Sequence, residues 1–475
     1  MKRLKELYPE YKGEDVEIQG IKINSKEVKP GDIFVCTLGV TTDRHDFIDE
    51  AIKNGASAVV VSRDIQLQIP TIKVENTNRE LPLLASRFYD HPEKELKLLA
   101  VTGTNGKTTV TSITQDLLGK DICGYLGTNG IICSHFNEPI INTTPDSDRL
   151  YGYFRRFIDS GCAYLSIETS SESYFRHRLD NLEFEVGVIT NITEDHLNIH
   201  KTIENYVSCK QQLLRQVRVG GTCILNTEDR YFSSCRDLVP ADRHLLTYGK
   251  SPEATLRIID YQLGDSSTKI TLSYSGKTYT TDSPLLGEFN IYNLCASLLT
   301  LVALEYSFPT ILKRVSAIQP PKGRVQFLHF GQPYTIVLDY AHTPDAFTQL
   351  YPLLHAIQKG KLITVTGSAG GREKEKRPLM GKIVLENSDH VIFTMDDPRN
   401  ENVEKIIDQL ISLRPDRSYE KIIDREQAIR HALEIAEPQD IVLIAGKGID
   451  NYMAINNEYL PYSDLEVIQN FFNKQ

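Results

Sequence analysis

The sequence predicts an α/β protein with three domains, at residues 1–93, 94–320 and 321–475. Its 475 residues exceed what one hydrophobic core usually supports. Apolar segments typical of buried strands alternate with helical patterns along most of the chain, which favours largely parallel sheets. Two polar, proline-containing segments, residues 91–94 and 319–323, interrupt this alternation and mark the domain boundaries.

The first domain is predicted to be a small α/β unit. Short strands flank an amphipathic helix near residues 47–54, and the run Ala-Val-Val-Val at residues 58–61 is typical of a buried strand. The segment at residues 91–94 breaks the helical pattern before it, so we expect a hinge there.

The second domain opens with an apolar strand at residues 96–102, which leads into a glycine-containing turn. Further strand patterns follow at residues 163–168, 186–189 and 223–225, with helical patterns between them. This order predicts a mostly parallel sheet that is covered by helices on both faces.

The third domain repeats the same alternation of strands and helices. Its strand patterns occupy residues 334–339, 361–366, 390–394 and 440–445. We therefore expect a second α/β sheet, of the Rossmann-like type.

Composition narrows the possible functions. The formal net charge of -10 leaves no broad basic surface for nucleic acid, although a local basic pocket can still bind a small anion. The N-terminus lacks the apolar region of a secretory signal, and the apolar stretch at residues 294–304 is too short to span a bilayer. The 8 cysteines form no CxxC pair, so we expect free thiols in a reducing cytoplasm.

The strongest functional signal is a glycine-containing loop between a predicted strand and a predicted helix. It consists of Gly103, Thr104, Asn105, Gly106, Lys107, Thr108 and Thr109. Glycines let the backbone N–H groups of such a loop face phosphate oxygens. We expect Lys107 to meet the β- and γ-phosphates of a nucleotide and the Thr108 hydroxyl to bind Mg²⁺. The alternative is a glycine turn with a solvated lysine, which the strand–loop–helix context disfavours.

The sequence GTNGKTT in this loop resembles the signature of the Mur ligases and of their folylpolyglutamate synthetase relatives. The resemblance runs through nearly the whole chain, with each later motif in the family's order. It implies a small N-terminal uridine-binding domain, a central P-loop-type ATPase domain with a parallel sheet, and a C-terminal Rossmann-like domain that binds an amino acid. ATP and Mg²⁺ are the cofactors it implies.

The family's catalytic and metal-binding residues match four positions here. Glu168 follows a predicted strand, where open parallel sheets place their ligand sites, and its carboxylate suits Mg²⁺. His196 lies in a segment that resembles the family's TNxxxDHL sequence, where this histidine would hold a second metal. Lys210 lies in a predicted helix, and the resemblance implies that it reacts with CO₂ to form a metal-binding carbamate. The implied catalytic set is Lys107, Glu168, His196 and Lys210, and the implied metal ligands are Thr108, Glu168, His196 and carbamylated Lys210.

Further nucleotide contacts come from three later motifs. Residues 287–293 match the family's GxFNxxN sequence, in which Asn293 would face the adenine. The same segment is typical of a helix N-terminus capped by Asn290, and the two interpretations are compatible. Arg324 resembles the interdomain arginine that meets the nucleotide, although the family's following glutamate is Gln326 here. Asp339 opens a sequence, DYAHTPD, that closely resembles the tripeptide-forming members of the family.

The binding site for a UDP-muramyl substrate is implied by motifs in the first two domains. Four residues depart from the family. Asn24 and Lys26 stand where the family has aspartate and arginine, Glu172 replaces a histidine and Arg176 replaces a glutamine. Arg176 fits an anionic substrate and a solvated surface position equally well. The implied residues are Ser25, Thr41, Thr42, Thr143, Thr144, Ser170, Arg176 and Arg178.

The amino-acid site is implied by three loops of the third domain. Arg372 would clamp the carboxylate of the incoming amino acid, and Arg399 in a DPR sequence suits a second, distal carboxylate. The shorter Asp450 stands where the family has glutamate, and Asp397 adds a charge that suits an ammonium. The balance favours diaminopimelate slightly over L-lysine. The implied residues are Arg372, Asp396, Asp397, Pro398, Arg399, Gly446 and Asp450.

Together the motifs predict an ATP-dependent ligase of peptidoglycan synthesis, in the tripeptide-forming (MurE) branch of the Mur ligases. It would add a diamino acid to the D-Glu γ-carboxylate of UDP-MurNAc-L-Ala-D-Glu through an acyl phosphate. The expected protein is a cytoplasmic monomer that binds small molecules, without nucleic acid or membrane insertion. Two alternatives stay open: a folylpolyglutamate-synthetase-like ligase, and a non-catalytic nucleotide-binding relative.

Overall fold

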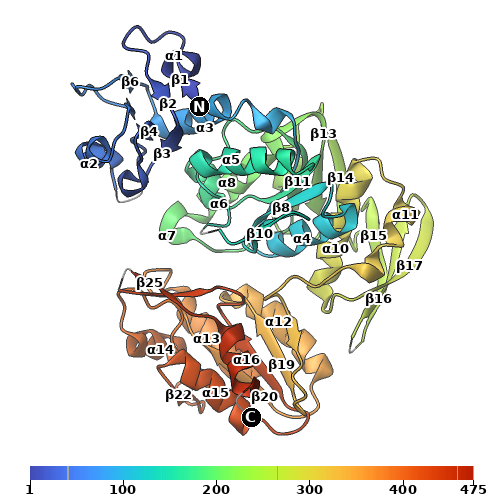
Figure 1. The fold of residues 1–475 in the computed structure, drawn as a ribbon. Coiled ribbons are helices and arrows are strands. Elements are labelled where there is room, and N and C mark those ends of the chain that lie inside the picture. The colour runs from blue at the N-terminus through green and yellow to red at the C-terminus, as the bar shows by residue number, and fades with distance from the viewer. Residues whose placement is uncertain (40–41, 141, 265, 457, 474–475) are drawn as a thin grey trace.

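The computed structural model describes residues 1–39, 42–140, 142–264, 266–456 and 458–473. These residues form three sheet-centred parts that follow one another along the chain (Figure 1). The predicted α/β class with parallel sheets is confirmed. In the part of the chain described, no helix is both long and apolar enough to cross a membrane.

A four-stranded parallel sheet forms the N-terminal part, in the order β3 (Gly20–Lys22), β4 (Asp32–Val35), β5 (Ala58–Val61) and β6 (Thr71–Lys73). Every residue of β4 and β5 is buried, as expected for interior strands of a parallel sheet. The predicted strand at residues 58–61 and the helix near residues 47–54 are both present. The other elements are β1 (Lys2–Arg3), β2 (Glu17–Ile18), α1 (Leu4–Leu7), α2 (Ile48–Lys53), α3 (Thr77–Phe88) and the 3-10 turns η1 (Ser25–Glu27), η2 (Arg44–Phe47) and η3 (Pro92–Lys94).

An eleven-stranded sheet forms the middle part, with parallel strands at its centre and antiparallel strands at both edges. The predicted strands at residues 96–102, 163–168, 186–189 and 223–225 lie in this parallel centre. In spatial order the strands are β10 (Asn137–Glu138), β9 (Gly130–Ile132), β8 (Cys123–Gly127), β11 (Tyr164–Glu168), β7 (Lys97–Thr102), β12 (Phe184–Ile189), β13 (Val217–Asn226), β14 (His244–Gly249), β15 (Leu256–Leu263), β16 (Thr268–Tyr274) and β17 (Lys277–Ser283).

Helices cover the middle sheet: α4 (Lys107–Leu118), α5 (Ser147–Asp159), α6 (Ser171–Phe175), α7 (Leu197–His200), α8 (Ile203–Gln216), α9 (Phe232–Arg236), α10 (Glu288–Ala303), α11 (Phe308–Leu312) and the 3-10 turn η4 (Val315–Ala317). The expectation that Asn290 caps a helix is wrong, because α10 already begins at Glu288. Gly287, at φ +91°, makes the turn before α10, and the Asn290 amide donates to the Leu286 carbonyl from inside the helix (2.7 Å).

The C-terminal part has a six-stranded sheet in the order β18 (Gln326–Leu328), β19 (Thr335–Asp339), β23 (Ile441–Ala445), β20 (Leu362–Thr366), β21 (His390–Phe393) and β22 (Glu420–Lys421). β18 pairs antiparallel to β19, and the other strands are parallel. The four predicted strands of this part are present as β19, β20, β21 and β23. Its other elements are α12 (Pro344–Ile357), α13 (Lys376–Asn387), α14 (Val403–Ile411), α15 (Arg425–Ile435), α16 (Asp464–Asn473) and the hairpin β24 (Tyr452–Ile455) and β25 (Glu458–Pro461).

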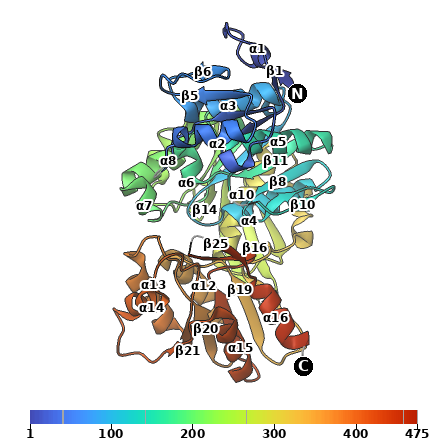
Figure 2. The ribbon, with the colours of Figure 1, turned by 60° about the vertical axis from the view of Figure 1, so that its left-hand side comes forward.

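The N-terminal and middle parts share one apolar core. Ile33 and Leu84 of the N-terminal part belong to the same buried cluster as Tyr151 and Phe154 of α5. Helices α3 and α5 pack against each other, and Figure 2 shows the N-terminal part seated on the middle one. The C-terminal sheet has clusters of its own, to which Leu286 and Phe289 of the middle part contribute among the described residues.

All 8 cysteines are buried and unpaired.

Candidate active site

The phosphate loop lies between β7 and α4, as predicted. Gly103 and Gly106 have φ values of +151° and +87°, which favour glycine. A Cβ at Gly103 would approach Thr190 Oγ1 to 1.9 Å, and one at Gly106 would approach Asn293 Oδ1 to 2.4 Å. Both glycines are therefore required by close approach as well as by backbone conformation.

The buried Lys210 and the half-buried Lys107 converge on this loop. Lys107 Nζ donates to the carbonyl oxygens of Gly103 (2.9 Å) and Thr104 (3.0 Å), and Lys210 Nζ on α8 donates to the same Gly103 oxygen (2.7 Å). Burial lowers the pKa of Lys107. Burial also holds the pKa of Lys210 well below its usual value, and the neighbouring charge of Lys107 lowers it further. Two lysine amines thus lie side by side where phosphates are expected, and burial and mutual repulsion favour the neutral form of Lys210.

Glu168, at the end of β11, lies beneath the loop. Its fully buried carboxylate accepts hydrogen bonds from Thr108 Oγ1 (3.0 Å), the Tyr125 hydroxyl (2.6 Å) and the Thr128 backbone N–H (2.9 Å). A threonine hydroxyl and a carboxylate are hard oxygen donors of the kind that Mg²⁺ prefers. The residues present therefore fit a magnesium ion beside the loop.

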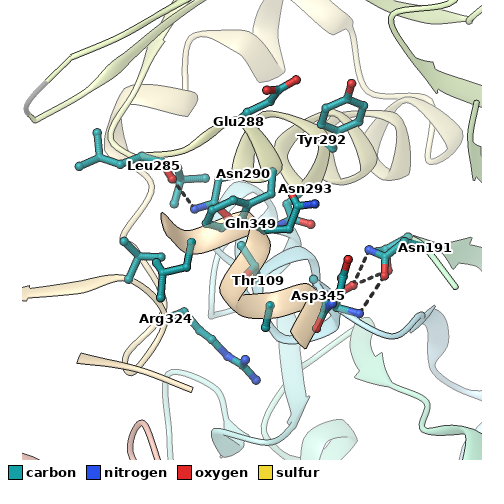
Figure 3. Close-up of a pocket in the computed structure, with 18 of the residues that line it drawn as sticks. Thr109, Asn191, Leu285, Glu288, Asn290, Tyr292, Asn293, Arg324, Asp345 and Gln349 are labelled. Atoms are coloured by element: carbon teal, nitrogen blue, oxygen red, sulfur yellow. Dashed lines mark hydrogen bonds between the residues drawn. The ribbon is translucent and has the colours of Figure 1, made fainter. Parts of the chain in front are cut away.

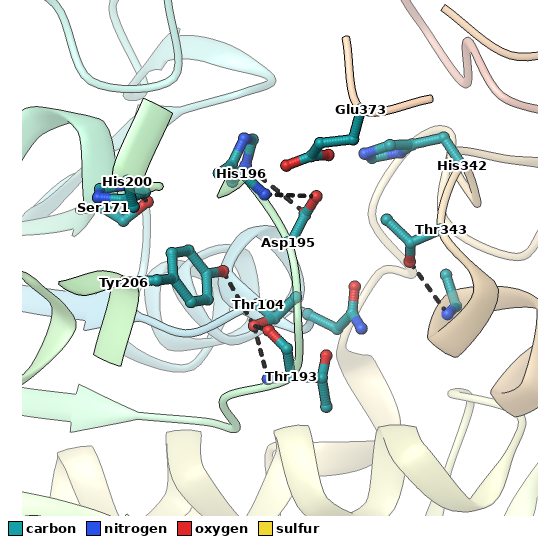
Figure 4. Close-up of polar contacts among 12 residues, drawn as sticks. Thr104, Ser171, Thr193, Asp195, His196, His200, Tyr206, His342, Thr343 and Glu373 are labelled. Carbon is teal, nitrogen blue, oxygen red and sulfur yellow. Dashed lines mark hydrogen bonds and ion pairs between the residues drawn. The ribbon is translucent and has the colours of Figure 1, made fainter. Parts of the chain in front are cut away.

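His196 lies on the far side of the loop, in a left-handed conformation at φ +56°. Its ring is near the carboxylates of Asp195 and of Glu373, a residue of the C-terminal part; in the described residues these three offer ligand atoms within 4.8 Å of one another. Figure 4 shows the three side chains facing one another, with His342 next to Glu373. Burial, partly offset by Asp195, lowers the pKa of His196 to about 4, so its ring is neutral at pH 7 and can bind a metal.

A cation of the protein already reaches this carboxylate pair. Lys376 Nζ lies 3.7 Å from Asp195 Oδ1 and 3.5 Å from Glu373 Oε2. The lysine and Glu373 belong to the C-terminal part, and Asp195 belongs to the middle part. This cluster therefore connects the two parts directly beside the phosphate loop.

A cavity of about 860 Å³ opens between the middle and C-terminal parts (Figure 3). Asn105, Thr109 and Asn293 line it from the middle part, and Arg324 and Asp345 line it from the third. This volume is in the range of nucleotide-sized ligand sites. Asn105 donates to the Asp345 carboxylate (2.5 Å), so the phosphate loop itself contacts α12.

Arg324 and Asp339 are connected through the segment that joins the two parts. Arg324 Nη2 donates to Thr108 Oγ1 (3.2 Å), and its guanidinium lies 4.6 Å from the centre of the Tyr340 ring. Both Asp339 oxygens accept backbone N–H groups, of Val325 (2.7 Å) and Ala341 (2.7 Å). Asp339 thus holds the segment that carries Arg324. Gln326, which departs from the family, accepts the Gly323 N–H (2.8 Å) and stabilises the same turn.

The residues implied for the UDP-muramyl substrate fall into two groups. Thr144, Ser170 and Arg178 lie together: Thr144 Oγ1 accepts the Ser170 N–H (3.1 Å), and Arg178 donates to the Thr144 carbonyl (3.0 Å). Thr143 lies next to this group, with its hydroxyl 3.1 Å from that of Thr128. Arg176 pairs with Glu172 (2.7 Å), so these two departures from the family compensate each other.

The second group belongs to the N-terminal part. Ser25 is buried and donates to Glu50 (2.5 Å), and Thr42 is exposed; Thr41 lies outside the described residues. A smaller cavity of about 160 Å³ lies between the N-terminal and middle parts, lined by Asn24 and Arg44 on one side and by Asn142 and Pro145 on the other. Ser25 and Thr42 are not among its lining residues.

The loops implied for the amino acid meet at the carboxyl ends of β20, β21 and β23. A Cβ at Gly370 would approach the Pro398 carbonyl to 1.9 Å, and Arg399 Nη1 donates to the Gly370 carbonyl (2.6 Å). Asp396 is buried against Gly446, and Arg372 is exposed on the loop before Glu373. The structure thus brings all three loops together.

The negative charge of Asp397 is paired with a buried lysine of the same part. The buried Lys447 Nζ donates to Asp397 Oδ1 (2.8 Å) and lies 3.7 Å from Asp450 Oδ2. Burial, partly offset by Lys447, raises the pKa of Asp450 to about 6. Lys447 therefore balances one of the two carboxylates, which leaves one net negative charge in this group when both are ionised.

Sequence reasoning missed four residues that the structure places at the site: Asp195, Asp345, Glu373 and Lys376. Each stands inside or next to a motif that was recognised for another residue. Their acidic or basic type was visible, but their convergence depends on packing between separate parts of the chain.

Comparison with known proteins matches the chain to three family models: "Mur ligase family, catalytic domain" at residues 17–91, "Mur ligase middle domain" at residues 101–301, and "Mur ligase, glutamate ligase domain" at residues 323–448. A relative from Clostridium acetobutylicum is 38% identical over 464 residues, 96% of this chain and 95% of the relative. It is named UDP-N-acetylmuramoyl-L-alanyl-D-glutamate–2,6-diaminopimelate ligase 2.

A relative from Bacillus licheniformis, named as a ligase of the same reaction, is 34% identical over 97% of this chain and 96% of its own. A solved structure of a UDP-N-acetylmuramoyl-L-alanyl-D-glutamate–2,6-diaminopimelate ligase is 27% identical, with a TM-score of 0.68 over 100% of this chain and 99% of that one. These matches extend along almost the full length of all three proteins. The resemblance seen in the sequence is confirmed, and the chain belongs to the Mur ligase family.

Proposed function

We propose that the chain is an ATP-dependent ligase that joins meso-2,6-diaminopimelate to the γ-carboxylate of D-glutamate in UDP-MurNAc-L-Ala-D-Glu, during peptidoglycan synthesis. The names of its full-length relatives support this reaction. One geometric observation carries it in the structure. The loop with Arg372 and Glu373 reaches His196 and Asp195 beside the phosphate loop, so an activated carboxylate and an incoming amine can meet there.

In the first step, the substrate carboxylate attacks the γ-phosphorus of ATP, which forms an acyl phosphate and releases ADP. Negative charge builds on the transferred phosphoryl group, and fixed positive charges beside it stabilise this transition state. Lys107 and Arg324 provide such charges on the two sides of Thr108. Arg324 comes from the segment after the middle part, so full stabilisation requires the C-terminal part to be in place.

In the second step, the α-amine of the diamino acid attacks the acyl carbon, and inorganic phosphate leaves with the electrons of the broken C–O bond. Water would compete as a nucleophile. The contacts of Lys376 with Asp195, and of Asn105 with Asp345, close the space between the two parts and exclude water from it.

Thr108 and Glu168 would hold one Mg²⁺, and His196 with a carbamate on Lys210 would hold a second. The metal ions would neutralise phosphate charge. The carbamate is supported by the state of Lys210: burial favours its neutral amine, which is the form that reacts with CO₂. The buried Lys210 amine donates to the Gly103 carbonyl (2.7 Å). Among the described residues, no carboxylate lies within hydrogen-bond distance of this amine.

The charges of the amino-acid site favour diaminopimelate over lysine. The distal end of diaminopimelate carries a carboxylate and an ammonium, whereas that of lysine carries an ammonium alone. Arg399 suits the distal carboxylate, and the net negative charge of Lys447, Asp397 and Asp450 suits the distal ammonium. With lysine, the guanidinium of Arg399 would face no anion, which disfavours that substrate.

Phosphate release from ATP tests the proposal, with UDP-MurNAc-L-Ala-D-Glu, Mg²⁺ and bicarbonate, and with diaminopimelate, L-lysine or no amino acid. We expect release with diaminopimelate alone, and the variant Arg399→Ala should lose this preference while Lys359→Ala should not. Release with lysine alone would contradict the choice of amino acid. Silence with both would overturn the ligase reaction and leave the folate-type and non-catalytic alternatives.

We also propose domain limits after residues 93 and 320, and action as a cytoplasmic monomer. The expected location follows from the substrates, because ATP and UDP-linked sugars are cytoplasmic metabolites. Size-exclusion chromatography with light scattering tests the monomer.

A further inference from the structure

A fully buried ion pair lies beneath the amino-acid site. Arg425 is the first residue of α15 and Asp464 is the first residue of α16, and both side chains have 0% exposure. Arg425 Nε donates to Asp464 Oδ1 (2.8 Å) and Nη2 donates to Oδ2 (2.8 Å). The Tyr462 hydroxyl donates to the same carboxylate (2.9 Å). This two-pronged geometry fixes the plane of the guanidinium.

The same guanidinium also binds two loops of the amino-acid site. Its Nη2 donates to the Ala445 carbonyl (2.9 Å) and its Nη1 donates to the Met395 carbonyl (3.3 Å). Met395 directly precedes the loop from Asp396 to Arg399. Ala445 directly precedes the loop from Gly446 to Asp450. One side chain therefore ties the starting points of both loops to the same helix.

There is no spare room between these loops. Gly446 has φ +119°, and a Cβ on it would lie 2.4 Å from Asp396 Oδ2 and 3.8 Å from Arg425 Nη2. Asp396, Gly446 and Arg425 are thus packed against one another. A shift of the guanidinium would be passed on to both loops, since neither can absorb it.

We infer that Arg425, held in place by Asp464, is a positioning residue that sets the spacing between residues 395–399 and 445–450. Its consequence for substrate choice rests on the proposed function. The pair touches no substrate; it acts through Asp396, Arg399 and Asp450. Stability alone does not account for this arrangement, because a buried ion pair can often be replaced by apolar side chains without loss of stability.

The test compares Arg425→Lys with two other variants in the full-length chain. A lysine keeps the charge opposite Asp464 but lacks the fork needed to bind both carbonyls. The double variant R425M/D464L removes the pair without leaving a lone buried charge. Leu354→Ala, which truncates a buried side chain of α12 that belongs to neither loop, is the control for a general loss of stability.

Two measurements are made on each variant: amide hydrogen exchange in the absence of substrates, and the KM for diaminopimelate, ATP and the UDP-linked substrate. We expect faster exchange in residues 395–399 and 445–450 of both Arg425 variants, and a KM for diaminopimelate raised on the order of 10- to 100-fold, as for a misplacement near 1 Å. The other two KM values should stay within about twofold of the Leu354→Ala values.

Exchange in the two loops that matches Leu354→Ala would overturn the inference, and so would a uniform rise in all three KM values. If the wild-type chain shows no turnover with any diamino acid, the proposed function fails. The exchange measurement then decides by itself whether Arg425 positions the loops.

Discussion

The two junctions between the parts of this chain are built from different contacts. The N-terminal and middle parts share a continuous apolar core, in which Ile33 and Leu84 are in one cluster with Tyr151 and Phe154. The middle and C-terminal parts meet through polar contacts around a cavity of about 860 Å³, such as Asn105 with Asp345 and Arg324 with Thr108. A smaller apolar contact is made by Leu286 and Phe289.

This difference predicts how the parts move. Opening the first junction would expose a buried apolar surface to water, which is costly. At the second junction, water or ligands can replace the polar contacts, so separation costs much less. We therefore expect the N-terminal and middle parts to behave as one body, and the C-terminal part to open and close over the nucleotide.

The largest expected effect comes from a cavity in the shared core. Phe154→Ala should lower the free energy of unfolding by about 3–5 kcal/mol, because the ring is fully buried between α5 and its neighbours. Denaturant unfolding followed by far-UV circular dichroism measures this loss. The N-terminal and middle parts should still unfold in one transition. A separate early transition of the N-terminal part would break the comparison, since it would show that the core is not shared energetically.

A substitution at the polar junction should reduce catalysis and leave the free energy of unfolding almost unchanged. Arg324→Ala should lower kcat/KM on the order of 10²- to 10³-fold, because it removes a positive charge next to Thr108. Its free energy of unfolding should change by less than about 1 kcal/mol, as for other partly exposed charges. Arg218→Ala, an exposed arginine paired with Glu185 on the middle sheet, is the control. A stability loss near that of Phe154→Ala would show that both junctions are rigid.

The sequence was sufficient to predict the apolar strands at the centres of the three sheets. The runs at residues 58–61 and 96–102 are apolar and rich in β-branched or aliphatic residues, so β5 and β7 could be located closely. The antiparallel strands β15, β16 and β17 were missed, although the alternation of buried and exposed residues in β16 is typical of a half-buried strand. The predicted strands were continuous apolar runs, and these three partly exposed strands contain no such run.

The residues of the site also divide into those that the sequence predicts and those that it does not. Loops at strand ends, such as the phosphate loop and the segment of His196, were predictable because their motifs are contiguous. Contacts across the polar junction were not predictable: Asn105 and Asp345 are 240 residues apart, and Asp195 meets Lys376 of α13 in the C-terminal part. Only the packing of the parts brings these charges together.

A pH-dependent effect is expected at the first junction. Asp148 of α5 is buried beside the smaller cavity, and its Oδ1 has no hydrogen-bond partner among the described residues. Burial, and then the charge of Asp146, raises the pKa of Asp148 to about 6. The folded chain thus binds this proton more tightly than the unfolded chain, whose aspartates titrate near pH ~4. Its stabilising contribution is fully present below about pH 4 and is lost as the pH rises through about 6.

Asp148→Asn should therefore stabilise the chain by about 1–2 kcal/mol at pH 7.5 and flatten the pH dependence of unfolding between about pH 4 and 6. Urea unfolding at several pH values measures this. Asp159→Asn, on the exposed side of the same helix, should follow the wild-type profile. An unchanged profile in Asp148→Asn would mean that the ionised carboxylate is solvated at the junction, and that this core is wetter than its apolar residues suggest.

The smallest expected effect concerns the ion pair that crosses the same junction. Arg149 Nη2 lies 2.8 Å and 2.6 Å from the two oxygens of Glu27, and each side chain is 41% exposed. Solvent screens such a pair, so a double-mutant cycle with Glu27→Gln and Arg149→Met should give a coupling energy of about 0.2–1 kcal/mol. A coupling above about 2 kcal/mol would mean that charge, as well as apolar burial, holds the first junction closed. With such a coupling, ion pairs would stabilise both junctions, Arg149–Glu27 at the first and Lys376–Asp195 at the second, and these pairs would differ mainly in solvent exposure. Raising the salt concentration should then weaken both junctions.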